Sequence, residues 1–137
     1  HLAARADGLV AFAMQWQGEG GEDAPLLGLH RLGQAATTAQ APPGEHRLMK
    51  GYAGSIAFDH SGAQVAISSP KGGLVQLFDP ETGFVASLHR PDLCGLAVAA
   101  RGMIISDGAG GVLALQDQQL ALLARADRAW DNHIVAL

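Results

Sequence analysis

One stretch, residues 55–88, decides the fold, because four short apolar runs alternate there with turn signals. The runs read SIAF (55–58), QVAISS (64–69), LVQLFD (74–79) and FVASL (84–88). The turns between them read DHSG (59–62), PKGG (70–73) and PETG (80–83). In such turns Asp can bond the backbone ahead of it, and Gly supplies a positive φ. The stretch predicts a four-stranded antiparallel sheet built from hairpins.

The same plan recurs on both sides of this stretch. Residues 95–123 contain GLAVA, MIIS, VLAL and LALL, residues 2–13 open a looser copy, and HIVAL (133–137) begins another. A spacing of about 40 residues with four strands per unit is typical of a β-propeller blade. We therefore predict an all-β, partial β-propeller of about three four-stranded antiparallel blades plus one extra strand. The expected blades are approximately 1–50, 51–92 and 93–129, and the closing strand is 130–137.

Two alternatives were weighed against this prediction. A β-sandwich also has short strands and turns, but it has no reason to repeat its turn chemistry at a fixed spacing. Residues 116–131 are rich in good helix formers, yet the phase of the repeat assigns 120–123 to an outer strand, which we favour. A short helical turn is expected around residues 43–49.

Composition excludes several classes of protein. The chain has 137 residues, 18 of them Gly, one Cys and a net charge of −4. A single Cys excludes an internal disulfide framework and a Cys-rich zinc site. Scattered basic residues argue against nucleic acid as a partner, and no apolar run is long enough for a membrane span.

Three blades cannot close a ring, since known propellers have about four to eight. The chain also begins in mid-pattern at His1, without an initiator Met, so we expect it to be part of a longer protein. Open sheet edges invite pairing with another chain. The expected partner is either the missing N-terminal blades of the same protein or a second copy, giving a homodimer.

Candidate site residues follow from the repeat. In a propeller, the loops that lead into the inner strands share one face with the loops between the second and third strands, and ligands commonly bind there. On this chain that face collects His1, Tyr52, Lys71, Asp107, Trp130, Asp131, Asn132 and His133.

These residues allow several kinds of chemistry. His1, Asp131 and His133 are candidate ligands for a metal ion such as Fe or Zn, although each His can equally hold its strand in place through a hydrogen bond. Cys94 can be a nucleophile with His133 as its base, but a lone Cys before a Gly reads better as a small buried apolar residue. No catalytic set and no cofactor is predicted.

The chain resembles the C-terminal half of a bacterial family of uncharacterised proteins, domain-of-unknown-function family 1513. The resemblance rests on HLA (1–3), GLHR (28–31), GYAGSIAFD (51–59), SPKGG (69–73) and WDNH (130–133). It implies a seven-bladed propeller that is exported to the periplasm behind a twin-arginine signal, in a gene setting with iron-uptake proteins. Taken together, we expect a non-enzymatic binding or interaction scaffold. The alternative is a metal- or cofactor-dependent enzyme of the lactonase or quinoprotein kind.

Overall fold

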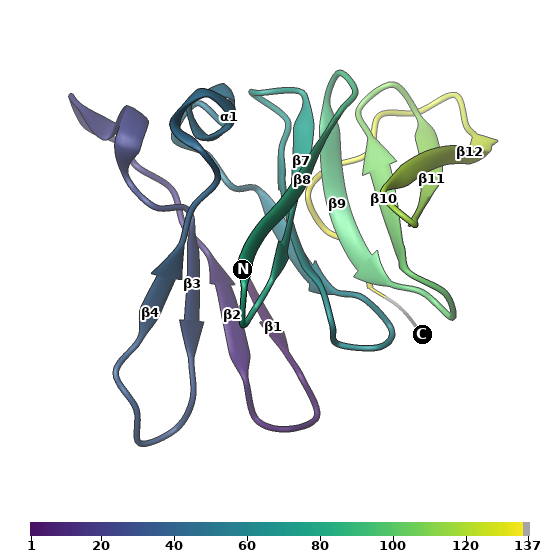
Figure 1. Ribbon diagram of the computed structural model, residues 1–137. Helices are drawn as coiled ribbons and strands as arrows, with labels where there is room; N and C mark the ends of the chain where they lie inside the picture. The colour runs from purple at the N-terminus through teal and green to yellow at the C-terminus, as the bar shows by residue number, and fades with distance from the viewer. Residues whose placement is uncertain (136–137) are drawn as a thin grey trace.

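The computed structural model describes residues 1–135, the side chain of Glu22 excepted, and they form three four-stranded antiparallel sheets (Figure 1). The first sheet contains β1 (Leu2–Ala4), β2 (Val10–Ala13), β3 (Leu27–His30) and β4 (Thr37–Ala39). The second contains β5 (Ser55–Phe58), β6 (Val65–Ser69), β7 (Leu74–Asp79) and β8 (Gly83–His89). The third contains β9 (Leu93–Val98), β10 (Met103–Asp107), β11 (Gly111–Gln116) and β12 (Gln119–Arg125).

Within each sheet the strands lie in chain order, so each sheet is a meander of hairpins. The predicted all-β, partial propeller-like fold is confirmed, and each expected blade range contains one sheet. Residues 119–125 form strand β12 rather than a helix, so the repeat phase was the better guide there. The helical turn expected near residue 43 is α1 (Pro43–Leu48).

Aspartate-led turns hold the hairpins together as the sequence predicted. Oδ1 of Asp59 accepts a hydrogen bond from the Gln64 backbone N–H at 3.0 Å. Oδ1 of Asp79 accepts two, from the backbone N–H groups of Glu81 and Thr82, and Gly83 then resumes the strand at φ 99°. A side chain that bonds the backbone ahead of it stabilises a tight turn without help from the rest of the fold.

Two apolar layers hold the sheets against one another. The layer between the first and second sheets includes Leu29, Val65 and Phe78, and the layer between the second and third includes Leu77 and Leu113. The second sheet is buried on both faces, and Leu74, Val75, Leu77 and Phe78 are at most 1% exposed. Apolar side chains of β7 therefore point to both faces of the sheet instead of to one, and the buried polar Gln76 among them donates from Nε2 to the Glu45 carbonyl oxygen at 2.9 Å.

The inner strands β1, β5 and β9 lie side by side. The Leu96 backbone N–H on β9 donates to Ser55 Oγ on β5 at 3.0 Å. The closing strand was expected over 130–137, of which 136–137 lie outside the described residues. Residues 130–135 form no ladder but make one parallel bridge, between His133 and Leu96. They extend the row of inner strands by a single contact.

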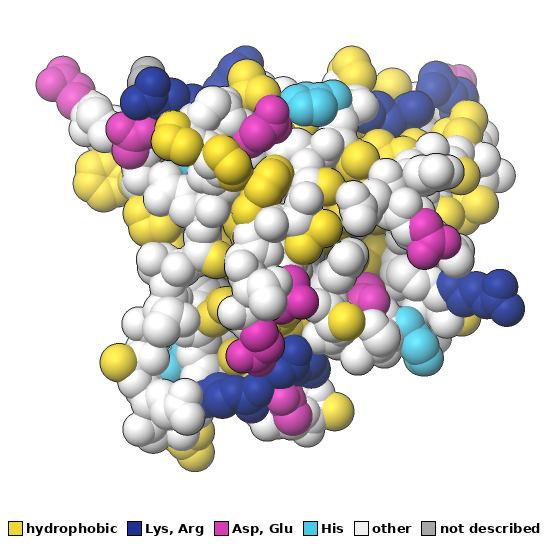
Figure 2. Space-filling model, in the orientation of Figure 1, with side chains coloured by type: hydrophobic (Ala, Val, Ile, Leu, Met, Phe, Trp, Pro, Cys, Tyr) yellow, Lys and Arg dark blue, Asp and Glu magenta, His cyan; other side chains and the backbone are white. Residues whose placement is uncertain are grey.

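The outward faces of the first and third sheets are apolar and uncovered in the described chain. On the third sheet, Ile104, Ala114 and Ala121 pair directly across β10, β11 and β12, so they share the face opposite the inter-sheet core. On β12, the edge strand of the third sheet, Leu123 is 59% exposed. Figure 2 shows hydrophobic side chains at the surface over this sheet. On the first sheet, Leu2 is 73% exposed.

Helices contribute little to the fold. The described helices are η1 (Gly21–Asp23) and α1, of three and six residues, and neither approaches the length and apolarity needed to cross a membrane.

Candidate functional site

Five of the predicted residues meet where the inner strands begin. Asn132 donates a hydrogen bond from Nδ2 to the Tyr52 hydroxyl at 3.1 Å, and Lys71 Nζ lies 4.7 Å from the centre of the Tyr52 ring. His133, next to Asn132, has its ring centroid 4.6 Å from that of His1. We call His1, Tyr52, Lys71, Asn132 and His133 the histidine–tyrosine cluster.

Two glycines allow the segment that carries Asn132 to approach the inner strands. A Cβ on Gly54 would lie 2.8 Å from Tyr52 Cε1 and 2.9 Å from Asn132 Oδ1. A Cβ on Gly95 would lie 2.8 Å from Ile134 Cγ1. Neither distance is compatible with an ordinary van der Waals contact, so these glycines are needed for close packing rather than for a positive φ.

Two buried polar atoms in residues 130–132, one of them in the cluster, are available for a ligand. Asn132 Oδ1 and Trp130 Nε1 are buried and have no hydrogen-bond partner among the described residues. The Trp130 ring is approached by the Arg128 guanidinium at 5.5 Å. Since buried polar atoms are nearly always paired, these two mark a place where a bound molecule or water can donate and accept.

The three candidate metal ligands do not form a complete set. His1 and His133 supply two imidazoles, but Asp131 Oδ1 accepts a hydrogen bond from the Asn132 backbone N–H at 2.7 Å. Among the described side chains, which leave out Glu22, no group of three or more His, Cys, Asp and Glu is placed to hold a metal ion. Catalytic zinc sites generally need three protein ligands.

Asp107 is held away from the cluster by contacts of its own. Its carboxylate pairs with Arg90, with Oδ2 2.7 Å from Nη2, and accepts backbone N–H groups of Ala109 and Gly111. Burial alone would raise the pKa of Asp107, but the Gly111 hydrogen bond and the Arg90 guanidinium outweigh it, and the pKa is lowered. These contacts make Asp107 the organiser of the β10–β11 turn.

Cys94 does not have the environment of a nucleophile. The side chain is 4% exposed, and its thiol donates to the Asp92 carbonyl oxygen at 2.9 Å. Burial and the nearby Asp92 carboxylate raise the pKa of the Cys94 thiol to about 12. The thiolate is the reactive form, so this Cys is inert at neutral pH.

A groove of about 510 Å³ runs along the inner strands. Its walls come from Ala3–Ala6 beside β1, from β5 and its turn, from Leu96–Val98 of β9, and from Ile134 and Val135. Its lining is mostly small or apolar. It therefore offers a hydrophobic path beside the polar cluster.

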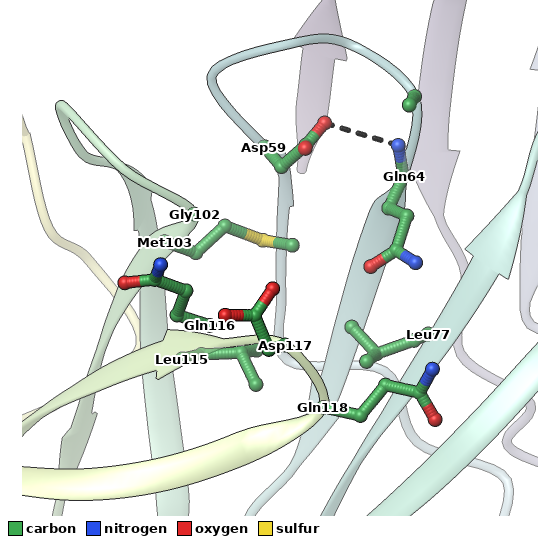
Figure 3. A pocket seen from close by; sticks show the side chains of 10 residues that line it. Asp59, Gln64, Leu77, Gly102, Met103, Leu115, Gln116, Asp117 and Gln118 are labelled. Carbon is green, nitrogen blue, oxygen red and sulfur yellow. Dashed lines mark hydrogen bonds between the residues drawn. The ribbon is translucent and has the colours of Figure 1, made fainter.

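A second hollow, of about 330 Å³, lies between the second and third sheets at their turn end (Figure 3). The sequence pattern does not reveal this hollow, because its walls come from three separate hairpins. One signal was available in principle: Asp117 and Gln118 form the two-residue β11–β12 turn, and both have positive φ, at 50° and 58°. Turns of this type favour Asn-Gly, so Asp-Gln is an unusual choice.

The three stacked blade-like sheets, with a polar cluster and a groove on their inner strands, define a partial propeller-like β protein. A family model described as "Protein of unknown function (DUF1513)" matches residues 1–137, and the chain belongs to that family. The resemblance noted from the sequence is thereby confirmed. Comparison with curated proteins finds no match.

Proposed function

We propose that this chain is part of a β-propeller that acts as a non-enzymatic binding or interaction scaffold. The observation that carries the proposal is the pair of uncovered apolar faces at the two ends of the three-sheet array. Internally, equivalent faces are buried in the two inter-sheet cores. An apolar sheet face of this kind is stable when another sheet covers it.

The covering sheets are further blades, supplied by the same protein or by a second copy of the chain. Residues 130–135 support this arrangement, because they run parallel to β9 at His133 and lie where a further inner strand would begin. The histidine–tyrosine cluster then presents the unpaired amide oxygen of Asn132 where the inner strands begin. From the family resemblance we further propose a periplasmic location and a role beside iron uptake, which cell fractionation of the full-length protein would test.

Light scattering over a range of concentrations tests the covering of the end faces. We expect the chain to self-associate, and Ala121→Lys, on the outward face of the third sheet, to weaken association about tenfold or more by placing a charge on an apolar contact. Leu32→Lys is the matched control, because Leu32 is 95% exposed in a turn away from that face. A wild-type chain that stays monomeric at high concentration would overturn the proposal.

Metal analysis separates the scaffold from the metal-dependent enzyme. After dialysis against Fe, Zn or Ca and removal of free metal, a scaffold retains no stoichiometric metal. One equivalent of metal that is lost in His133→Ala would favour the enzyme instead, with His1 and His133 as ligands.

A further inference from the structure

The hollow between the second and third sheets has the chemistry of a small binding site, separate from the surfaces used in the proposed function. It lies beyond the C-terminal end of β5, whereas the histidine–tyrosine cluster lies before its start. Its volume of about 330 Å³ is at the small end of the range for ligand pockets. A molecule of a few non-hydrogen atoms fits such a space.

The floor of this pocket is apolar and deeply buried. Leu77, Met103 and Leu115 form it, from β7, β10 and β11, and each is at most 2% exposed. Figure 3 shows Met103 and Leu115 on one side of the hollow and Leu77 on the other. A short hydrocarbon part can contact this floor without losing hydrogen bonds, whereas the water shell of a hydrated metal ion would meet no polar partner there.

The rim carries negative charge and carboxamides. Asp59 and Asp117 line it together with Gln64, Gln116 and Gln118. Of the ten described residues that line the pocket, none is Lys, Arg or His. A negatively charged group would find no countercharge there, whereas a cation would find two carboxylates and three amide oxygens.

The two carboxylates are not equally engaged. Asp59 accepts the Gln64 backbone N–H and the Ser61 hydroxyl, as the turn requires, which leaves part of its acceptor capacity free. Asp117 makes no hydrogen bond or ion pair within the described chain, and it is exposed at a positive φ. The positive φ values of Asp117 and Gln118 are those of a two-residue hairpin turn, which places both side chains at the rim of the pocket.

We propose that this pocket binds a small organic cation, an alkylammonium group whose hydrocarbon part rests on Leu77, Met103 and Leu115. The ammonium lies between Asp59 and Asp117 and donates to their carboxylates. The amide oxygens of the rim glutamines take its remaining N–H group. The chemical class is a small primary amine, for which n-butylammonium serves as the probe.

The test is a titration of the isotopically labelled chain with n-butylammonium chloride, followed by NMR at constant ionic strength. We expect saturable shifts centred on the backbone amides of Gln64 and Gln118. n-Butanol and sodium butyrate, of the same length but neutral or negative, should produce no saturable shift at these amides.

Variants test whether the negative charge at the rim causes the binding of n-butylammonium. Asp117→Asn should weaken n-butylammonium binding about fivefold, because it removes one partly exposed ion pair while Asn still tolerates a positive φ. Asp127→Asn is the matched control, since it makes the same charge change at an exposed residue outside the pocket. Ala63→Lys, at the rim, should abolish binding by placing a tethered ammonium in the site.

Four results would overturn the proposal. The first is equal binding of n-butanol and n-butylammonium, and the second is equal weakening of binding by Asp117→Asn and Asp127→Asn. The third is unchanged n-butylammonium binding in Ala63→Lys. The fourth is saturable Ca²⁺ binding at Gln64 and Gln118 without n-butylammonium binding. Self-association of the chain does not bear on these outcomes, so failure here and failure of the proposed function are distinguishable.

Discussion

The Tyr52 hydroxyl accepts a hydrogen bond of 3.1 Å from Asn132 Nδ2, which joins residues 80 positions apart in the chain. The contact ties the segment after the third sheet to the start of the inner strand of the second sheet. It therefore reaches across the third sheet, which lies between the two residues in the chain. The contact also fixes where His133 lies relative to His1.

Tyr52→Phe should lower the free energy of unfolding by about 1 kcal/mol, because Asn132 Nδ2 loses its partner. The ring remains, so the contact with Lys71 is kept. Urea denaturation measures the stability, and hydrogen exchange at residues 131–134 should quicken. In a double-mutant cycle with Asn132→Ala, purely additive effects would contradict a direct contact.

Gly54→Ala should be destabilising by about 1–3 kcal/mol, because the added methyl would press on Tyr52 and Asn132. Gly44→Ala is its control: it lies in α1, where a Cβ meets nothing within 4 Å. That change should be neutral or stabilising by up to about 1 kcal/mol. Thermal denaturation of both variants gives the comparison, and equal effects would argue against crowding at Gly54.

Asp107→Asn should destabilise the fold by about 2 kcal/mol at pH 7, because Arg90 loses its buried partner. The pKa of Asp107 is lower in the folded chain than in the unfolded one. Its stabilisation is therefore fully present above the unfolded pKa of about 4, and it is lost as the pH falls through the folded value. Denaturation of both proteins between pH 7 and pH 3 should show their difference in unfolding free energy becoming smaller as the pH falls. A difference that does not change with pH would show that the carboxylate charge does not cause the stabilisation.

Native Cys94 should resist alkylation by iodoacetamide at pH 8. With a thiol pKa of about 12, almost none of the reactive thiolate is present. Mass spectrometry should find labelling at least about a hundredfold slower than in the urea-unfolded chain, whose thiol has an ordinary pKa. Similar rates in the two states would mean that the thiol is exposed and activated.

Much of the fold could be predicted because the signals for it are local. Short apolar runs such as SIAF and turn residues such as Asp59 and Asp79 act within a few positions of themselves. The repeat of about 40 residues also located β12 correctly against its helix-forming composition. Of the expected closing strand over 130–137, residues 130–135 make one bridge, between His133 and Leu96, because a ladder needs a further partner strand.

The candidate site could be predicted only as a set of positions at one end of the inner strands. Of the eight predicted residues, five form the histidine–tyrosine cluster, while Asp107 is paired with Arg90. The sequence could not separate these roles, because Asp107 follows the same turn pattern whether or not an Arg lies nearby.

By itself the sequence determined the strands, the turns and the repeat, since periodicity and turn chemistry depend on near neighbours. Only the tertiary structure decided that Asn132 meets Tyr52, and that Asp59 and Asp117 face one pocket from different hairpins. Those meetings depend on how the sheets stack. Stacking is set by apolar side chains such as Leu77 and Leu113, whose burial is non-directional and leaves no local signature in the chain.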